Sequence, residues 1–286
     1  MEPLHLGSCS IYVGTCSWKD HTRFFPEKLP DPQKIAFYAE HFPFVEVDST
    51  YYGMPSARNA VLWAERTPPG FLFGFKAYRV MTLQGRHEDG RRVPEEPTPE
   101  LFQQFSEGVR PLQEAGKLAY VLLQFPDWFL PWKQNAKARE PFEYLAACAE
   151  WLPGLPLAVE FRNGYWFQGE RAEQTLRFLS DHNLAYTVVD EPQVGVSRSA
   201  PDVQAVTSEL SVMRFHGRRT DVWAQRGVGV ADRFSYDYST EELQPWADRL
   251  AALARETKHL FVGFNNCHHD FAVNNAKQLM QMLLDL

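Results

Sequence analysis

The sequence is poor in cysteine. Its 286 residues contain four, at Cys9, Cys16, Cys148 and Cys267, and no two of them form a C-x-x-C pair. This spacing excludes a zinc ribbon and a dithiol redox motif, and four cysteines in a chain of this length do not make a disulfide framework. We expect reduced thiols, as is typical of cytoplasmic proteins.

Long hydrophobic segments are also missing. The apolar runs are short, as at Leu118–Leu123, whereas a transmembrane helix needs roughly 20 apolar residues. The first residues, MEPLHLGSC, lack the basic start and the apolar stretch of a signal peptide. We therefore expect a soluble, cytoplasmic protein that is not embedded in a membrane.

The charge of the chain is moderately acidic. It has 36 acidic and 29 basic residues and a formal net charge of −7. This balance argues mildly against general binding to nucleic acid or to a membrane surface, although a local basic patch is compatible with it. With 44% hydrophobic and 23% charged residues, the composition is that of a globular protein and excludes intrinsic disorder. Nothing in the sequence predicts an oligomeric state.

Short β-type runs alternate with helical patterns along the whole chain. The runs are rich in Val, Phe, Leu and Tyr, and most end at a polar residue, which is typical of strands. Eight strands are predicted, at Ile11–Thr15, Phe44–Asp48, Phe71–Lys76, Ala119–Gln124, Leu157–Phe161, Leu184–Val189, Ser211–His216 and Leu260–Phe264. Helix signals fill most of the gaps, for example Asp31-Pro32, Ser56, Thr98-Pro99 and a Ser239–Glu242 capping box.

The predicted fold is a single α/β domain, a (β/α)8 TIM barrel over residues 1–286. The alternation also fits a doubly wound sheet, but Gly14-Thr15-Cys16-Ser17 after the first strand lacks the GxGxxG turn that would favour it. The count of eight and the even spacing favour the barrel. Residues 191–210 show no helical pattern, so the crossover between the sixth and seventh strands is expected to be irregular. Residues 86–100, charged and rich in proline, are interpreted as a loop insertion.

The candidate site lies at the carboxyl ends of these strands, where function gathers in TIM barrels. The ends and the loops after them carry these candidates: Trp18, Glu46, Asp48, Tyr52, Lys76, Gln124, Glu160, Arg162, Asp190, Arg214, His216, Asn265 and Asn266. Three pairs among them lie two residues apart: Glu46 with Asp48, Glu160 with Arg162, and Arg214 with His216. This spacing places both members of a pair on one face of a strand. Charged groups on the inner face need partners, so we expect one shared polar pocket.

General acid–base catalysis is the chemistry predicted for this pocket. Glu160, Asp190 and His216 are the candidate catalytic residues, because positioned carboxylates and imidazoles commonly transfer protons. A divalent metal ion is compatible with the carboxylates of the set but is not favoured, since several cations would share the cavity. We assign no metal ligand, and the sequence leaves the cofactor unknown. A serine hydrolase is not expected, because the G-x-S-x-G elbow is missing.

Anion recognition has firmer support. Lys76, Arg162 and Arg214 stand at predicted strand ends, and residues 214–233 hold five arginines, two aspartates and no lysine. Arginine is favoured where a phosphate or carboxylate is held by two hydrogen bonds. Aromatic side chains in the same loops, such as Trp18, offer faces to sugar rings or nucleobases. We therefore expect a small anionic ligand.

The strand-end motifs form a characteristic series. In chain order they are Gly14-Thr15-Cys16-Ser17-Trp18, Val45–Tyr52, Phe75-Lys76, Leu123–Pro126, Glu160-Phe161-Arg162, Arg214–Gly217, Tyr236-Asp237-Tyr238, Phe264–Asn266 and Asn275-Ala276. Together they resemble the YecE-like family, also called domain of unknown function 72. The resemblance implies a (β/α)8 barrel with a polar pocket at the carboxyl face of its strands. It implies no particular reaction.

The sequence departs from this family pattern in three places. The family usually has asparagine where Asp48 stands, glycine where Ser17 stands, and a histidine where Leu83 follows Thr82. Asp48 adds a negative charge to the pocket and so weakens a purely anionic interpretation of the ligand. The missing histidine weakens any acid–base role for the loop after the third strand.

Three functions remain open at this point. The leading hypothesis is an enzyme, a hydrolase, lyase or isomerase, that acts on a small sugar- or nucleotide-like phosphate, with His216, Asn265 and Asn266 orienting the ligand. The second is a nucleic-acid binding or processing protein resembling barrel endonucleases, which rests on fold analogy alone. The third is a ligand-binding protein without catalysis.

Overall fold

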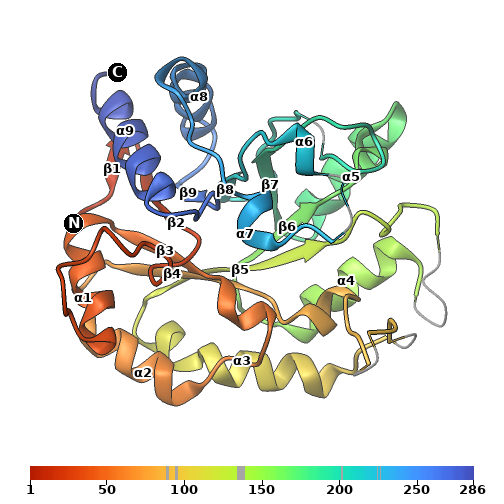
Figure 1. The fold of residues 1–286 in the computed structure, drawn as a ribbon. Coiled ribbons are helices and arrows are strands. Elements are labelled where there is room, and N and C mark those ends of the chain that lie inside the picture. Colours follow the sequence, from red (N-terminus) through yellow and green to blue (C-terminus); the bar gives the residue numbers. More distant parts are fainter. Residues whose placement is uncertain (88–89, 94–95, 134–138, 201, 224, 226) are drawn as a thin grey trace.

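A closed barrel of eight parallel strands forms the centre of the protein. The computed structural model describes the whole chain except residues 88–89, 94–95, 134–138, 201, 224 and 226. The barrel strands are β2 (Cys9–Thr15), β3 (Phe44–Val47), β4 (Leu72–Lys76), β5 (Leu118–Phe125), β6 (Leu157–Phe161), β7 (Leu184–Asp190), β8 (Leu210–Phe215) and β9 (His259–Phe264). Each pairs with the next in chain order, and β9 pairs with β2 to close the sheet (Figure 1). The predicted TIM barrel and its eight strands are confirmed.

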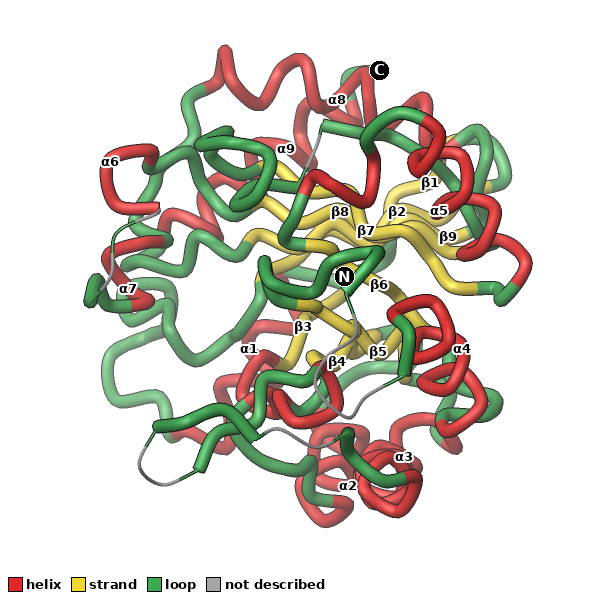
Figure 2. Tube along the Cα trace, turned by 90° about the vertical axis from the view of Figure 1, so that its right-hand side faces the viewer, coloured by secondary structure: helices red, strands yellow, loops and turns green. Residues whose placement is uncertain are grey.

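Helices surround the barrel, with the strands at the centre (Figure 2). The helices are α1 (Asp31–His41), α2 (Ala57–Arg66), α3 (Pro99–Glu114), α4 (Pro141–Trp151), α5 (Glu170–Asp181), α6 (Thr220–Trp223), α7 (Val230–Arg233), α8 (Thr240–Ala254) and α9 (Phe271–Leu284). In the described part of the chain, three 3₁₀-helices follow strand ends, at Asp48–Tyr51, Arg79–Thr82 and Gly164–Phe167. Among the residues that the structure describes, no helix combines the length and the apolar character that crossing a membrane requires.

The predicted helix starts are confirmed in part. The Ser56 side chain caps α2, and Ser239 and Glu242 form the capping box of α8. Asp31 was wrong as a cap, because it is already the first residue of α1 and Pro30 precedes it as the N-cap. Thr98 occupies the N-cap of α3, but its side chain makes no capping hydrogen bond.

Three other elements bear on the predictions. A short strand, β1 (Leu4–Leu6), pairs antiparallel with β2 outside the barrel and was not expected. The described residues between β7 and β8 contain no helix, so the irregular crossover is confirmed. The predicted insertion at 86–100 is shorter than expected, since α3 begins at Pro99; residues 88–89 and 94–95 lie outside the described part of the chain.

The barrel interior is apolar at its amino end and charged at its carboxyl end. The apolar part is a buried cluster of Phe44, Ala119, Tyr120, Leu122, Ala158, Ala185, Val212 and Phe261. Because side chains alternate along a strand, the residues two positions beyond Phe44, Ala158 and Val212 also face inward. Those residues are charged, and they begin the candidate site.

A buried lysine outside the barrel ties β5 to α2. Lys117 Nζ donates hydrogen bonds to the carbonyl oxygens of Ala64 and Thr67, at 2.7 and 2.6 Å, and to the Thr67 hydroxyl at 2.9 Å. We expect Lys117→Met to lower the free energy of unfolding by about 1–3 kcal/mol, because it leaves these acceptors buried without a donor.

Urea denaturation measures this loss, and Lys258→Met is the matched control. Lys258 pairs with Glu209 at the surface, where such a pair contributes at most about 1 kcal/mol. Equal losses in the two variants would contradict a structural role for Lys117.

Candidate active site at the carboxyl end of the barrel

A buried arginine lies at the centre of the barrel mouth. Arg214 on β8 is fully buried and donates from Nη1 to Glu160 Oε2 at 2.6 Å and from Nη2 to Glu46 Oε1 at 2.7 Å. Glu46 and Glu160 come from β3 and β6, so one guanidinium group joins three strands. Burial disfavours its charge, but the two carboxylates raise the pKa of Arg214 well above its usual value. The group is a permanent cation.

Both carboxylate oxygens of Glu46 accept hydrogen bonds. Tyr120 Oη donates to Glu46 Oε2 at 2.7 Å. The tyrosine ring can reach this position because Gly74 lies beside it: a Cβ at Gly74 would be 2.7 Å from the ring. Burial opposes ionisation of Glu46, but the Arg214 guanidinium overcomes it and lowers the pKa of the carboxyl group.

His216 is held as a neutral ring. Its Nδ1 lies 2.9 Å from the Asn265 side-chain nitrogen, and its Nε2 lies 3.2 Å from Glu160 Oε1. One tautomer satisfies both contacts: Nδ1 accepts from the amide, and the Nε2 proton is donated to the carboxylate. Burial lowers the pKa of His216 to about 3, which agrees with an uncharged ring. His216 therefore links Asn265 to the buried ion pairs.

Glu160 has no free hydrogen-bonding position on Oε1. This oxygen accepts from Gln124 Nε2 at 2.6 Å and from Arg162 Nη1 at 3.0 Å, besides its contact with His216. Burial raises the pKa of a carboxyl group, but Arg214 and His216 reverse this and hold the pKa of Glu160 well below its usual range. Glu160 is thus a fixed anion, poorly suited to the proton transfer predicted for it.

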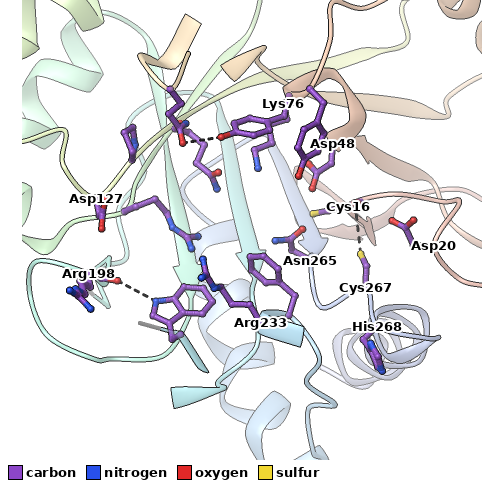
Figure 3. Close-up of a pocket in the computed structure, with 18 of the residues that line it drawn as sticks. Cys16, Asp20, Asp48, Lys76, Asp127, Arg198, Arg233, Asn265, Cys267 and His268 are labelled. Carbon is purple, nitrogen blue, oxygen red and sulfur yellow. Dashed lines mark hydrogen bonds between the residues drawn. The ribbon is translucent and has the colours of Figure 1, made fainter. Parts of the chain in front are cut away.

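A cavity of about 920 Å³ opens above this buried layer. Its lining residues come from most strand ends and loops: Cys16, Asp20, Asp48, Tyr51, Tyr52, Lys76, Gln84, Arg86, Gln124, Pro126, Asp127, Arg162, Arg198, Trp223, Gln225, Arg233, Phe234, Asn265, Cys267 and His268. Figure 3 shows Asp48 and Lys76 at one side of the cavity and Arg198 and Arg233 at the other. Among the described residues that line the cavity, five carry basic side chains and three are aspartates, so its wall favours anions.

Asp48 is the carboxyl group of the cavity whose protonation is most altered. Burial, and then the nearby negative charge of Glu46, raise the pKa of Asp48 to about 8 against the pull of Lys76. Its Oδ1 is buried, has no hydrogen-bond partner among the described residues and lies 3.7 Å from Arg214 Nη2, while 24% of the side chain is exposed. At neutral pH this carboxyl group holds a proton that it can donate.

A second acidic group stands behind the cavity wall. Arg162 Nη1 lies 3.0 Å from Glu191 Oε2, and the guanidinium group packs 4.9 Å from the ring centre of Trp223. Burial raises the pKa of Glu191 to about 7 despite Arg162. Glu191 Oε1 also accepts from the backbone nitrogen of Ala200, which fixes the loop after β7 against the site.

Three of the predicted site residues lie elsewhere. Asp190 points away from the cavity. Its carboxylate accepts hydrogen bonds from Arg218 Nε at 2.9 Å and from Tyr238 Oη at 2.6 Å. Trp18 is buried against Trp63, with ring centres 5.3 Å apart. Asn266 is buried and binds Tyr236 and Asn275 at 2.7 and 2.8 Å. These three side chains hold the barrel and its loops together and do not line the cavity.

The other ten predicted residues come together at the barrel mouth. Six line the cavity: Asp48, Tyr52, Lys76, Gln124, Arg162 and Asn265. Four are fully buried beneath the cavity: Glu46, Glu160, Arg214 and His216. Tyr120 was not predicted, although it lies four residues before Gln124 and therefore on the same face of β5. Gln84, Phe234 and Gln225 were not predicted either, because they lie in loops with no distinguishing pattern.

The cysteines and histidines at the mouth do not form a metal centre. Within the described ranges of the chain, no three His, Cys, Asp or Glu side chains converge closely enough to hold an ion. Cys16 lines the cavity, but burial raises the pKa of its thiol well above the usual value. A neutral thiol is a poor nucleophile, so Cys16 is interpreted as part of the wall.

Comparisons with known proteins agree with the resemblance seen in the strand-end motifs. The model of a family described as "Protein of unknown function DUF72" matches residues 12–285. The UPF0759 protein YunF of Bacillus subtilis (strain 168) is 37% identical over 277 residues, which cover 96% of this chain and 94% of YunF. The UPF0759 protein YecE of Escherichia coli (strain K12) is 28% identical over 195 residues, 66% of this chain and 62% of YecE.

Solved structures give the same result. A DUF72 family protein of Enterococcus faecalis V583 superposes with a TM-score of 0.83 at 30% identity, covering 96% of this chain and 95% of that one. A DUF72 family protein of Thermotoga maritima MSB8 superposes with a TM-score of 0.78 at 33% identity, covering 96% and 99%.

Proposed function

We propose that this chain, which belongs to the DUF72 family of proteins of unknown function, is an enzyme for a small phosphorylated substrate of sugar- or nucleotide-like size. The substrate occupies the cavity at the carboxyl end of the barrel, and Asp48 transfers a proton to or from it. The observation that carries the proposal is the joint presence, in one cavity, of a cationic wall and a carboxyl group that is protonated at neutral pH.

The size and the charge of the cavity support a small anion. Its volume of about 920 Å³ lies within the range of cavities that enclose small ligands. Arg233 Nη2 donates to the Gln225 carbonyl oxygen at 3.2 Å, and its buried Nε makes no hydrogen bond to any described residue. Arg162 contributes a second guanidinium group, oriented by two carboxylates. Guanidinium groups hold phosphate by paired hydrogen bonds, so these two residues are the proposed phosphate ligands.

We assign proton transfer to Asp48 and not to Glu160 or Asp190, the two carboxyl groups predicted from the sequence. Glu160 is an anion whose oxygens are occupied by hydrogen-bond donors and Asp190 is engaged by Arg218, whereas Asp48 lines the cavity with 24% of its side chain exposed. Perturbed carboxyl groups in clefts are characteristic of general acids and bases. Lys76 and Asn265 line the same cavity and complete a polar surface around the substrate.

Isothermal titration with ribose 5-phosphate, adenosine monophosphate and inorganic phosphate tests the anion site. We expect binding of at least one of the three, and at least tenfold weaker binding by Arg233→Gln, which corresponds to about 1.4 kcal/mol. Arg255→Gln is the matched control, because Arg255 is an exposed arginine at the end of α8, outside the cavity. If no anion binds to the wild-type protein, the proposal is wrong. Binding without turnover of any phosphorylated compound would make the protein a non-catalytic binder.

A further inference from the structure

We propose that Lys76 is a nucleophile that forms an imine with a carbonyl carbon of the substrate, which makes the substrate a phosphorylated aldehyde or ketone. This inference rests on the proposed function, because the same cavity supplies the phosphate contacts. It adds a covalent step and a reacting group to that function.

The position of Lys76 suits a nucleophile. It ends β4, is only partly buried, and lines the cavity. Among the described residues, none accepts a hydrogen bond from Nζ or forms an ion pair with it, and Nζ lies 4.6 Å from the ring centre of Tyr51. Lysines with only a structural role are normally paired or solvated, as Lys117 is paired here. An amine that is unpaired and open to a cavity is free to react.

The surroundings of Lys76 lower the pKa of its amine and so raise the fraction of neutral amine. Burial, together with the positive charge of Arg214, lowers the pKa of Lys76, while Asp48, Glu160 and Glu46 act in the opposite direction. Lysines become nucleophilic when they are desolvated or placed beside another cation. Partial burial and the nearby Arg214 guanidinium both act in this direction at Lys76.

Asp48 is placed to assist the reaction. In the register of β3 and β4, Glu46 pairs with Gly74 and Val47 with Phe75, so Asp48 and Lys76 are the next residues along these neighbouring strands. Figure 3 shows the two side chains on the same side of the cavity. A proton donor on the same side of the cavity as the amine is what the formation and loss of a carbinolamine require.

The steps balance with these two groups alone. The Nζ lone pair forms a C–N bond to the carbonyl carbon, and the carbonyl oxygen takes the proton of the Asp48 carboxyl group. The Asp48 carboxylate then removes one proton from the nitrogen and returns it to the hydroxyl group, which leaves as water when the C–O bond breaks. The products are a protonated imine on Lys76, a carboxylate on Asp48 and one water molecule, with no oxidant or reductant.

The experiment traps this imine by reduction. The wild-type protein is incubated with dihydroxyacetone phosphate and sodium cyanoborohydride, digested, and analysed by peptide mass mapping. We expect one modified peptide, containing Lys76, whose mass increases by that of the probe less one oxygen atom. Dihydroxyacetone, which lacks the phosphate, should label Lys76 at least tenfold less, because it lacks the phosphate contacts.

Two variants serve as controls. Lys76→Arg has a side chain of similar length that cannot form an imine, so the adduct should be lost while the melting temperature stays within a few degrees of the wild type. Lys19→Arg, an exposed lysine that does not line the cavity, should leave labelling at Lys76 unchanged.

The outcomes separate this inference from the proposed function. If phosphate compounds bind in calorimetry but Lys76 is not modified, or is modified no more than surface lysines, the imine is overturned and the anion site stands. If neither binding nor labelling occurs, both proposals fail. Labelling of Lys76 that inorganic phosphate suppresses supports both.

Discussion

Replacing Arg214 by methionine is expected to lower the free energy of unfolding by about 3–5 kcal/mol, the largest single-site loss that this structure predicts. The reason is that Glu46 and Glu160 would remain buried and ionised, 0% exposed, with no cation between them. Removing one partner of a buried ion pair costs more than the pair contributes, because an isolated charge in a low-dielectric interior is poorly stabilised. Urea denaturation at pH 7 measures the loss.

The control removes the charges together. Adding Glu46→Gln and Glu160→Gln to Arg214→Met should recover a large part of the lost stability, since neutral amides tolerate burial better than carboxylates. A loss of less than about 1 kcal/mol in Arg214→Met would show that the two carboxylates take up protons at little cost. A triple variant that is less stable than the single one would contradict the electrostatic explanation.

The buried ion pairs were predictable because a strand alternates its side chains strictly. Glu160 and Arg214 each follow an inward-facing apolar residue, Ala158 and Val212, by two positions. An alternating pattern fixes the face of a side chain without any knowledge of its partner. The eight strands were found for a related reason: a strand packed between barrel and helices is apolar on both faces and stands out from the polar loops.

The same rule explains the error at Asp190. Ala185 faces the barrel interior, so Thr187, Val189 and Glu191 share its face, and Asp190 points outward. Applied to β7, the rule selects Glu191, which does contact Arg162 in the site. The prediction named Asp190 and left out Glu191, although alternation places only Glu191 on the inward face.

Other parts of the site could not be predicted by any local rule. The contacts that bury Trp18 against Trp63 and hold Asn266 by Asn275 depend on the packing of separate helices and loops. The four-residue helices α6 and α7, which carry Trp223 and Arg233 to the cavity, are too short for a helical pattern to show. Such features arise only when distant segments meet.

Replacing Asp48 by asparagine is expected to stabilise the protein, increasingly so as the pH rises from about 4 to about 8. In the unfolded chain this carboxyl group loses its proton near pH 4, whereas in the folded protein it does so at about 8. Over that interval the folded state binds more protons than the unfolded state, so this group lowers the free energy of unfolding by up to about 1.4 kcal/mol per pH unit. Asparagine titrates in neither state.

The measurement is urea denaturation of both proteins at intervals between pH 4 and pH 9. The difference in the free energy of unfolding, variant minus wild type, should be smallest at pH 4, rise to as much as about 5 kcal/mol, and level off above pH 8. Asparagine has nearly the same shape as aspartate and is uncharged, as the protonated Asp48 is at pH 7, so the variant should fold. The same substitution should abolish labelling of Lys76, because the proton donor is removed.

Glu191→Gln is the matched comparison, since the pKa of Glu191 is raised to about 7. The difference in the free energy of unfolding between Glu191→Gln and the wild type should rise over the same acidic range but level off about one pH unit earlier. A difference for Asp48→Asn that stays constant across the whole range would mean that Asp48 ionises normally in the folded protein, and it could then not serve as the proton donor. A rise that ends near pH 8 would show that the fold is destabilised to keep this carboxyl group protonated, as is expected of a group retained for chemistry and not for stability.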